Sequence, residues 1–166
     1  MVTRLREDSH LPAEGWTNWI WAMAPENTTR VKNLSRRGED QEGYKNAKKV
    51  NELCGEHGDA DRLSGIYEWR ATRPFGSDPT VVYVGSTCAR NGGPCTKMKN
   101  RIVSYCTHGN HKTTLINEAL QKGYELWVRF KPAVDEQEAR DMENALLDTY
   151  NYAWNIRQNA VRNILP

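Results

Sequence analysis

The sequence predicts an α+β fold, in which a small three-stranded antiparallel sheet is flanked by helices and preceded by an N-terminal helical extension. Alternation of apolar and polar residues predicts strands at residues 64–72, 80–85 and 124–130. The sequence predicts helices at residues 96–105, 113–121 and 136–150, and apolar residues recur at helical spacing in the last two. The resulting order of two strands, two helices, one strand and one helix is typical of an α+β domain.

The first two strands are expected to form a hairpin. Residues 64–72 alternate in the manner of a strand, and residues 80–85, Thr-Val-Val-Tyr-Val-Gly, are rich in β-branched side chains. Residues 73–79, Arg-Pro-Phe-Gly-Ser-Asp-Pro, form a turn or short loop between them.

The later elements have recognisable ends. Thr113 is placed to cap the helix over residues 113–121, and Gly123 is placed to end it. Residues 124–130 alternate strictly and form the third strand. Residues 136–150 carry an apolar stripe at helical spacing, which predicts a long final helix.

The N-terminal part differs from the rest in composition. Trp16, Trp19 and Trp21 lie close together, and apolar residues recur at helical spacing over residues 44–54. We therefore predict a tryptophan-containing helical extension over residues 1–60 and the main domain over residues 61–166. The tryptophans are expected to pack against the main domain, with stacking on DNA as the alternative.

Composition limits the class of protein. The 23 basic and 21 acidic residues give a net charge of +2, which does not by itself indicate nucleic-acid binding. If DNA is the partner, the basic groups must be clustered, and a second copy of the chain or a partner protein would strengthen binding. The sequence has no apolar run of about 18 residues and no secretory signal, so we expect no membrane contact. The location is then intracellular: the nucleus in a eukaryote, otherwise the cytoplasm.

Two triplets connect the hairpin to a known family. Gly65-Ile-Tyr67 followed by Tyr83-Val-Gly85 resembles the paired signature of GIY-YIG nucleases, with Val in place of Ile in the second triplet. Four further residues of the stretch 64–155 each lie on the type of element where this family places its counterpart. They are Arg101, Tyr105, Glu143 and Asn155. The resemblance implies the GIY-YIG fold and a metal-dependent phosphodiesterase site.

A second resemblance is narrower. Residues 146–155, Leu-Leu-Asp-Thr-Tyr-Asn-Tyr-Ala-Trp-Asn, resemble the corresponding stretch of plant effector-of-transcription proteins, which carry a GIY-YIG-like domain. The stretch from Gly85 to Arg101 is longer than in minimal family members, and residues 88–95 are interpreted as an inserted loop. The effector-of-transcription subfamily is discussed as DNA-acting regulators, so the resemblance also supports a regulator that does not cleave DNA.

Phosphodiester hydrolysis explains why these residue types would occur together. Mg²⁺ or Mn²⁺ can polarise the phosphate and keeps several waters, so a single carboxylate, Glu143, is sufficient to bind it. The alternative for Glu143 is a salt bridge to Arg101. The forked guanidinium of Arg101 is suited to hold the scissile phosphate, and the alternative is a surface arginine.

The resemblance implies roles for the remaining residues. One strand tyrosine assists deprotonation of the attacking water; we favour Tyr67 as the base and Tyr83 as its partner, which requires a pKa lowered by positive charge. Tyr105 lies one helical turn after Arg101, beside the phosphate. Asn155 ties backbone or a tyrosine hydroxyl together. The alternatives are packed aromatics for the three tyrosines and a helix-end cap for Asn155.

A basic cluster near the motif is expected to contact the DNA backbone. Its members are Arg90, Lys97, Lys99, His111 and Lys112. A zinc site is a weaker alternative for the cysteines, since the spacings of Cys88, Cys95 and Cys106 are not those of common zinc modules. Three functions follow: a DNA endonuclease, a DNA-binding regulator on the same fold, and a plain interaction module supported only by the tryptophan-rich N-terminus.

Overall fold

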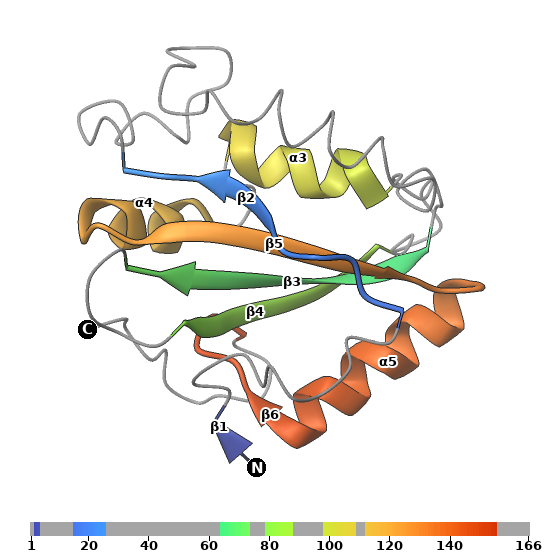
Figure 1. Cartoon of the computed structure of the whole chain (residues 1–166). Helices are drawn as coiled ribbons and strands as arrows, with labels where there is room; N and C mark the ends of the chain where they lie inside the picture. The colour runs from blue at the N-terminus through green and yellow to red at the C-terminus, as the bar shows by residue number, and fades with distance from the viewer. Residues whose placement is uncertain are drawn as a thin grey trace.

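The computed structural model of the chain describes residues 2–3, 15–25, 64–73, 79–87, 98–108 and 112–155. The expected α+β fold is confirmed (Figure 1). The predicted strands are β3 (Gly65–Thr72), β4 (Thr80–Thr87) and β5 (Glu125–Pro132). The predicted helices are α3 (Met98–His108), α4 (Thr113–Gln121) and α5 (Glu136–Thr149). Two short strands, β1 (Val2–Thr3) and β6 (Tyr150–Asn151), pair in parallel apart from the main sheet.

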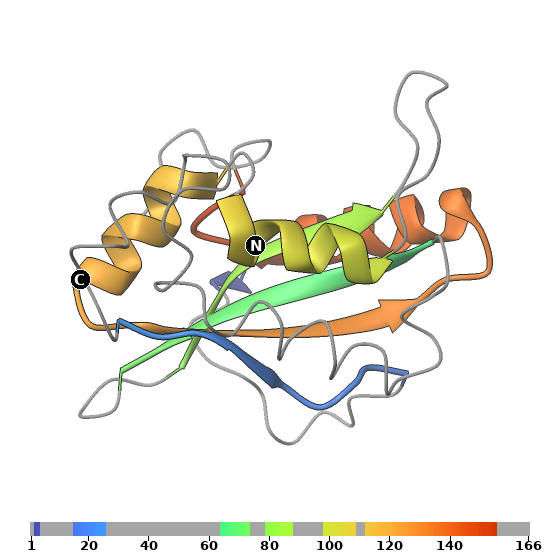
Figure 2. The same ribbon diagram turned by 90° about the horizontal axis from the view of Figure 1, so that it is seen from above.

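The main sheet has four antiparallel strands in the order β2-β5-β3-β4, as Figure 2 shows from above. β3 is central, and its Tyr67 pairs with Gly85 on β4 and with Phe130 on β5. β4 is an edge strand of this sheet. The sheet therefore places Tyr67, the last residue of the first triplet, directly opposite Gly85, the last residue of the second.

The fourth strand corrects the prediction of three strands and of a helical N-terminus at this point. β2 (Ile20–Met23) pairs antiparallel with β5 through Trp21 and Trp127. Its residues alternate between the two faces of the sheet, and pairing with a strand about 100 residues later gives no local signal in the sequence. The helix predicted at residues 44–54 and the domain boundary at residue 60 lie outside the described residues.

Local sequence explains the ends of α4 and α5. Asp135 caps α5 by accepting a hydrogen bond from the Glu138 amide at 2.8 Å. Acidic residues in the first turn stabilise α5 through their interaction with the positive end of the helix dipole. Gly123 ends α4 with a left-handed φ of 88°, as predicted. The cap expected at Thr113 is wrong by one position, because Thr113 is already helical and Lys112 precedes it without a side-chain cap.

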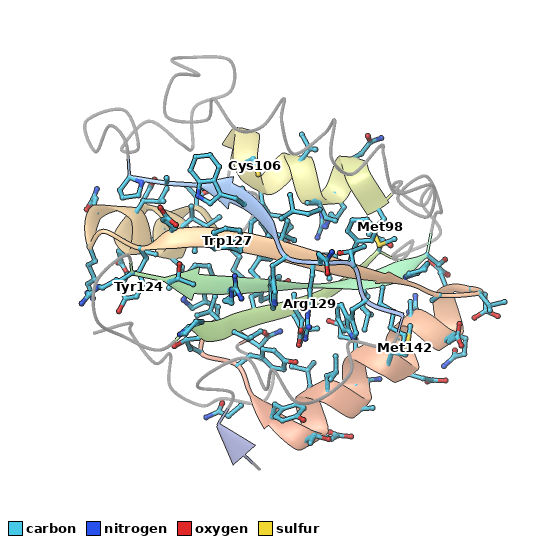
Figure 3. All side chains as sticks on the ribbon, viewed as in Figure 1. Met98, Cys106, Tyr124, Trp127, Arg129 and Met142 are labelled. Carbon is cyan, nitrogen blue, oxygen red and sulfur yellow. The ribbon has the colours of Figure 1, made fainter. Side chains whose placement is uncertain are left out.

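The two faces of the sheet carry different helices. Tyr67, Tyr83 and Phe130 pack in one apolar cluster with residues of α3 and α4. α5 packs on the opposite face, where its side chains meet Ile66 and Val84. Figure 3 shows Met98 and Cys106 on α3, on the other side of the sheet from Met142 on α5. Among the described residues, none of the helices has the length and hydropathy needed to cross a membrane.

Candidate active site

Three tyrosines meet on the face of the sheet covered by α3. Tyr67 comes from β3, Tyr83 from β4 and Tyr105 from α3, and we call them the tyrosine cluster. Each ring centroid lies between 5.7 and 6.2 Å from the other two, and the hydroxyls of Tyr67 and Tyr105 are hydrogen-bonded at 2.9 Å. All three side chains are buried. The structure thus joins residues separated by up to 38 positions into one group of phenols.

The glycines of the two triplets make room for this cluster. A Cβ at Gly85 would lie 2.6 Å from the Tyr67 hydroxyl oxygen, so the Tyr67 ring lies against the bare backbone of β4. A Cβ at Gly65 would lie 2.7 Å from the Lys131 carbonyl oxygen and 2.7 Å from the Met98 sulfur. Gly65 therefore allows α3 to approach β3 closely, and Gly85 places the phenol.

Arg101 lies beside the cluster, one turn before Tyr105 on α3. Its Nε donates to the Tyr67 hydroxyl oxygen at 3.4 Å, and its guanidinium carbon lies 5.8 Å from the Tyr105 ring centroid. The side chain is half-buried. A guanidinium in this position has only part of its donor capacity directed at Tyr67, so it can also bind an anion at the surface of the cluster.

The phenols do not have the lowered pKa that a base would need. Burial raises the pKa of Tyr67, and this effect exceeds the opposing influence of the Arg101 charge and of the Tyr105 hydrogen bond. Burial likewise raises the pKa of Tyr83 and that of Tyr105. All three phenols are therefore protonated at neutral pH in this structure.

Glu143 approaches the cluster from the other face of the sheet. It lies half-buried on α5, and its carboxylate accepts a hydrogen bond from the hydroxyl of Ser86, the residue after Gly85. Its charge also contributes, after burial, to the raised pKa of Tyr67 and of Tyr83. Arg101 and Glu143 are both within the described residues, and they do not form the salt bridge considered as an alternative. Arg101 instead contacts the Tyr67 hydroxyl on β3, and Glu143 is bonded to Ser86 on β4.

Asn155 holds β4 from its outer edge. Its side-chain oxygen accepts from the Val84 amide at 3.0 Å, and its side-chain nitrogen donates to the Val84 carbonyl at 2.9 Å. The Trp154 amide donates to the Val82 carbonyl at 2.8 Å. Residues 152–155, which we call the edge segment, thus satisfy backbone groups that an edge strand would leave open. The expectation that Asn155 ties backbone together fits this geometry.

The predicted DNA contacts fall largely outside the described residues. This holds for Arg90, Lys97, His111 and the side chain of Lys99. Lys112 is described, and it is buried: its ammonium donates to the Trp154 carbonyl at 2.6 Å and lies 4.8 Å from the Tyr83 ring centroid. It supports the edge segment from the core side, where a DNA backbone does not reach.

The donor set near Glu143 fits one hard cation with few protein ligands. Within the described residues, no group of three or more His, Cys, Asp or Glu side chains could surround a metal. Mg²⁺ binds through one or two carboxylates and keeps water ligands, so Glu143 beside the Ser86 hydroxyl is compatible with it. Of the cysteines considered for zinc, Cys106 is buried in the apolar core, and the others lie outside the described residues.

Two features of the site were missed at the sequence level. Ser86 is the hydrogen-bond partner of Glu143, and its position directly after the second triplet was the available signal. On the α5 face, Glu68 is buried in contact with Arg129 and Tyr152. A charged residue inside each of two apolar strands is a signal for such a pair, because a buried charge needs a partner.

Comparisons with known proteins match a family over about half of the chain. The sequence profile of GIY-YIG domain-containing proteins matches residues 80–165. The match begins at β4 and includes Glu143 and Asn155, whereas β3 with Tyr67 precedes it.

One curated relative is a plant protein. Over 144 residues the chain is 28% identical to Protein EFFECTOR OF TRANSCRIPTION 3 of Arabidopsis thaliana. This alignment covers 81% of the chain and 52% of the relative, so the chain spans about half the length of that protein. No solved structure matches the chain significantly.

Proposed function

The chain belongs to the family of GIY-YIG domain-containing proteins, and from this premise we propose that it is a DNA endonuclease dependent on a divalent cation, Mg²⁺ or Mn²⁺. One observation carries the proposal. The hydroxyl of Tyr67 is in contact with Tyr105, Arg101 and the backbone of Gly85, and the next residue, Ser86, is bonded to Glu143. The phenol bonded to the guanidinium thereby lies beside Gly85, and the carboxylate is bonded to the next residue of the same edge strand.

Each group has a chemical task in hydrolysis. Arg101 binds the scissile phosphate and neutralises its charge. Water attacks phosphorus and the bond to the leaving sugar oxygen breaks. Tyr67, after its own proton has passed to solvent, accepts a proton of the water as a phenolate, and the leaving oxygen takes a proton from solvent. Glu143 would hold the cation, which when bound polarises the phosphate and opposes the contribution of Glu143 to the raised pKa of Tyr67.

A second function is favoured by two specific observations. Burial raises the pKa of every phenol in the tyrosine cluster, which opposes proton abstraction at neutral pH. The plant relative is named for an effect on transcription. Both observations fit a DNA-binding regulator that uses the same fold without cleavage.

DNA is the proposed partner in both cases. A net charge of +2 gives little long-range attraction to DNA, so we expect a second copy of the chain or a partner protein to contribute to binding. We propose that the protein is nuclear if it acts in transcription, the process for which its plant relative is named.

The decisive experiment is nicking of supercoiled plasmid by the purified protein, with Mg²⁺, with Mn²⁺ and with EDTA. We expect cleavage only with a cation, and we expect Glu143→Gln, which keeps the size and the contact to Ser86, to abolish it. Asp141→Asn is the matched control, because Asp141 is an exposed carboxylate on the same helix, and this variant should retain activity.

The outcomes separate the two functions. Cleavage that persists in EDTA or in Glu143→Gln would exclude the proposed site. DNA binding in a gel-shift assay without cleavage under any cation would favour the regulator. Arg101→Lys distinguishes a forked phosphate contact from a simple charge, because lysine keeps the charge but cannot bind phosphate through two parallel N–H groups.

A further inference from the structure

A buried ionic network lies on the face of the sheet opposite the tyrosine cluster. Glu68 on β3 pairs across the sheet with Arg129 on β5. Arg129 donates to one carboxylate oxygen of Glu68 through Nε at 2.9 Å and through a terminal nitrogen at 2.6 Å. Tyr152 donates its hydroxyl proton to the other oxygen at 2.6 Å. Glu68 is fully buried, so these three residues, the buried network, satisfy its charge within the core.

The N-terminal tryptophans enclose the cation of this network. The guanidinium of Arg129 lies 4.6 Å from the Trp16 ring centroid and 4.7 Å from that of Trp19. Thr17 fixes this segment to β5, since its amide donates to the Phe130 carbonyl and its hydroxyl accepts from the Phe130 amide. Figure 3 shows Arg129 on β5 within the sheet. The tryptophans therefore remove water from around the ion pair between Arg129 and Glu68.

Tyr152 connects the buried network to the edge of β4. It is the first residue of the edge segment, and its carbonyl accepts from the Asn155 amide at 3.1 Å. Asn155 in turn bonds to both backbone groups of Val84. The position of the Tyr152 hydroxyl on Glu68 thus fixes the segment that holds β4.

The edge segment also contacts β4 at the point where the hydrogen bonding between β3 and β4 is irregular. Trp69 pairs with Tyr83 and Arg70 with Val81, so Val82 is an extra residue in β4. The carbonyl of Val82 accepts from the Trp154 amide. At this bulge the placement of β4 depends on the edge segment as well as on β3, and Tyr83 lies directly beside it.

We infer that Glu68, Arg129 and Tyr152 are positioning residues that set the edge strand carrying Tyr83, Gly85 and Ser86 against Tyr67. Tyr67 and Glu68 are adjacent on β3 and point to opposite faces, so one strand holds the phenol and the anchor of the edge segment. Apolar residues of similar volume often replace a buried ion pair without loss of stability, so geometry is the contribution specific to the ions. The effect on catalysis rests on the proposed nuclease function; the effect on β4 does not.

The test uses Tyr152→Phe, which removes one hydroxyl and keeps the packed ring. Tyr150→Phe is the matched control, because this neighbouring phenol makes an edge-to-face contact with Tyr152 at 6.4 Å. Amide hydrogen exchange is measured at Val84, whose N–H is bonded to Asn155, and at Val128 in the middle of the sheet. We expect exchange at Val84 to accelerate about five- to tenfold in Tyr152→Phe only, with Val128 unchanged.

Plasmid cleavage is measured in the same variants. We expect kcat to fall about 10- to 100-fold in Tyr152→Phe with little change in KM, as for other groups that orient reacting residues. Equal acceleration at Val84 and Val128 would mean that the hydroxyl serves global stability, and it would overturn the inference, as would unchanged exchange at both. Faster exchange at Val84 alone, in a protein that never cleaves DNA, would support the inference and refute the nuclease function.

Discussion

Adding one methyl group at Gly85 is the sharpest perturbation of the tyrosine cluster. The new Cβ would lie 2.6 Å from the hydroxyl oxygen, 2.7 Å from Cζ and 3.0 Å from Cε2 of Tyr67. Ordinary van der Waals contact begins at 3.4 Å, so the phenol must retreat by about 0.8 Å, the difference between 3.4 and 2.6 Å. It cannot do so freely, because Tyr67 is fully buried and bonded to Tyr105.

The expected cost follows from this displacement. Forcing an extra methyl group into a packed core costs about 1–3 kcal/mol. Misplacing a reacting group by about 1 Å lowers the rate roughly 100-fold, so Gly85→Ala should cleave DNA about 100 times more slowly than the native chain. Urea unfolding measures the first quantity, and plasmid cleavage at saturating protein measures the second.

Gly123→Ala provides the control. A Cβ there meets no atom within 4 Å, but the left-handed φ of 88° makes the substitution unfavourable by about 1–2 kcal/mol. It should therefore lose similar stability and keep its cleavage rate. In a Tyr67→Phe background, Gly85→Ala should cost less stability, since the nearest clashing atom is gone. Native stability and native activity in Gly85→Ala would refute the proposal that glycine is needed at position 85 to make room for the Tyr67 ring.

Three further predictions concern protonation and the edge segment. In EDTA, the free energy of unfolding should fall above about pH 10, because burial raises the pKa of Tyr67, Tyr83 and Tyr105 above that of unfolded tyrosine. In urea titrations, Tyr67→Phe should make this decline shallower by about 1.4 kcal/mol per pH unit, because one fewer proton is involved. Lys112→Met should cost about 1.5–3 kcal/mol of stability, through the lost bond to the Trp154 carbonyl, and leave the salt dependence of DNA binding unchanged in gel shifts. Asn155→Asp should destabilise the chain by about 1–3 kcal/mol at pH 8, because a carboxylate replaces the donor to Val84, and by less at pH 4, where protonation restores a donor.

Secondary structure was well predicted where the signal is local. The helix at residues 113–121 and its end at Gly123 follow from apolar spacing and from the one residue that adopts a left-handed conformation at no steric cost. The strands around Tyr67 and Tyr83 follow from alternation. The N-terminal strand was not found, because its partner Trp127 lies more than 100 positions later and its own pattern spans four residues.

The sequence by itself determined the family of this protein, the order of its strands and helices from β3 to α5, and the residue types available for phosphodiester chemistry. Only the tertiary structure decided their environment. Tyr67 was expected to be a base with a lowered pKa, but desolvation outweighs the charge of Arg101 and raises it. Lys112 was expected on a DNA-binding surface and lies in the core. Burial and distance between charges depend on which segments pack together, and one-dimensional spacing does not encode them.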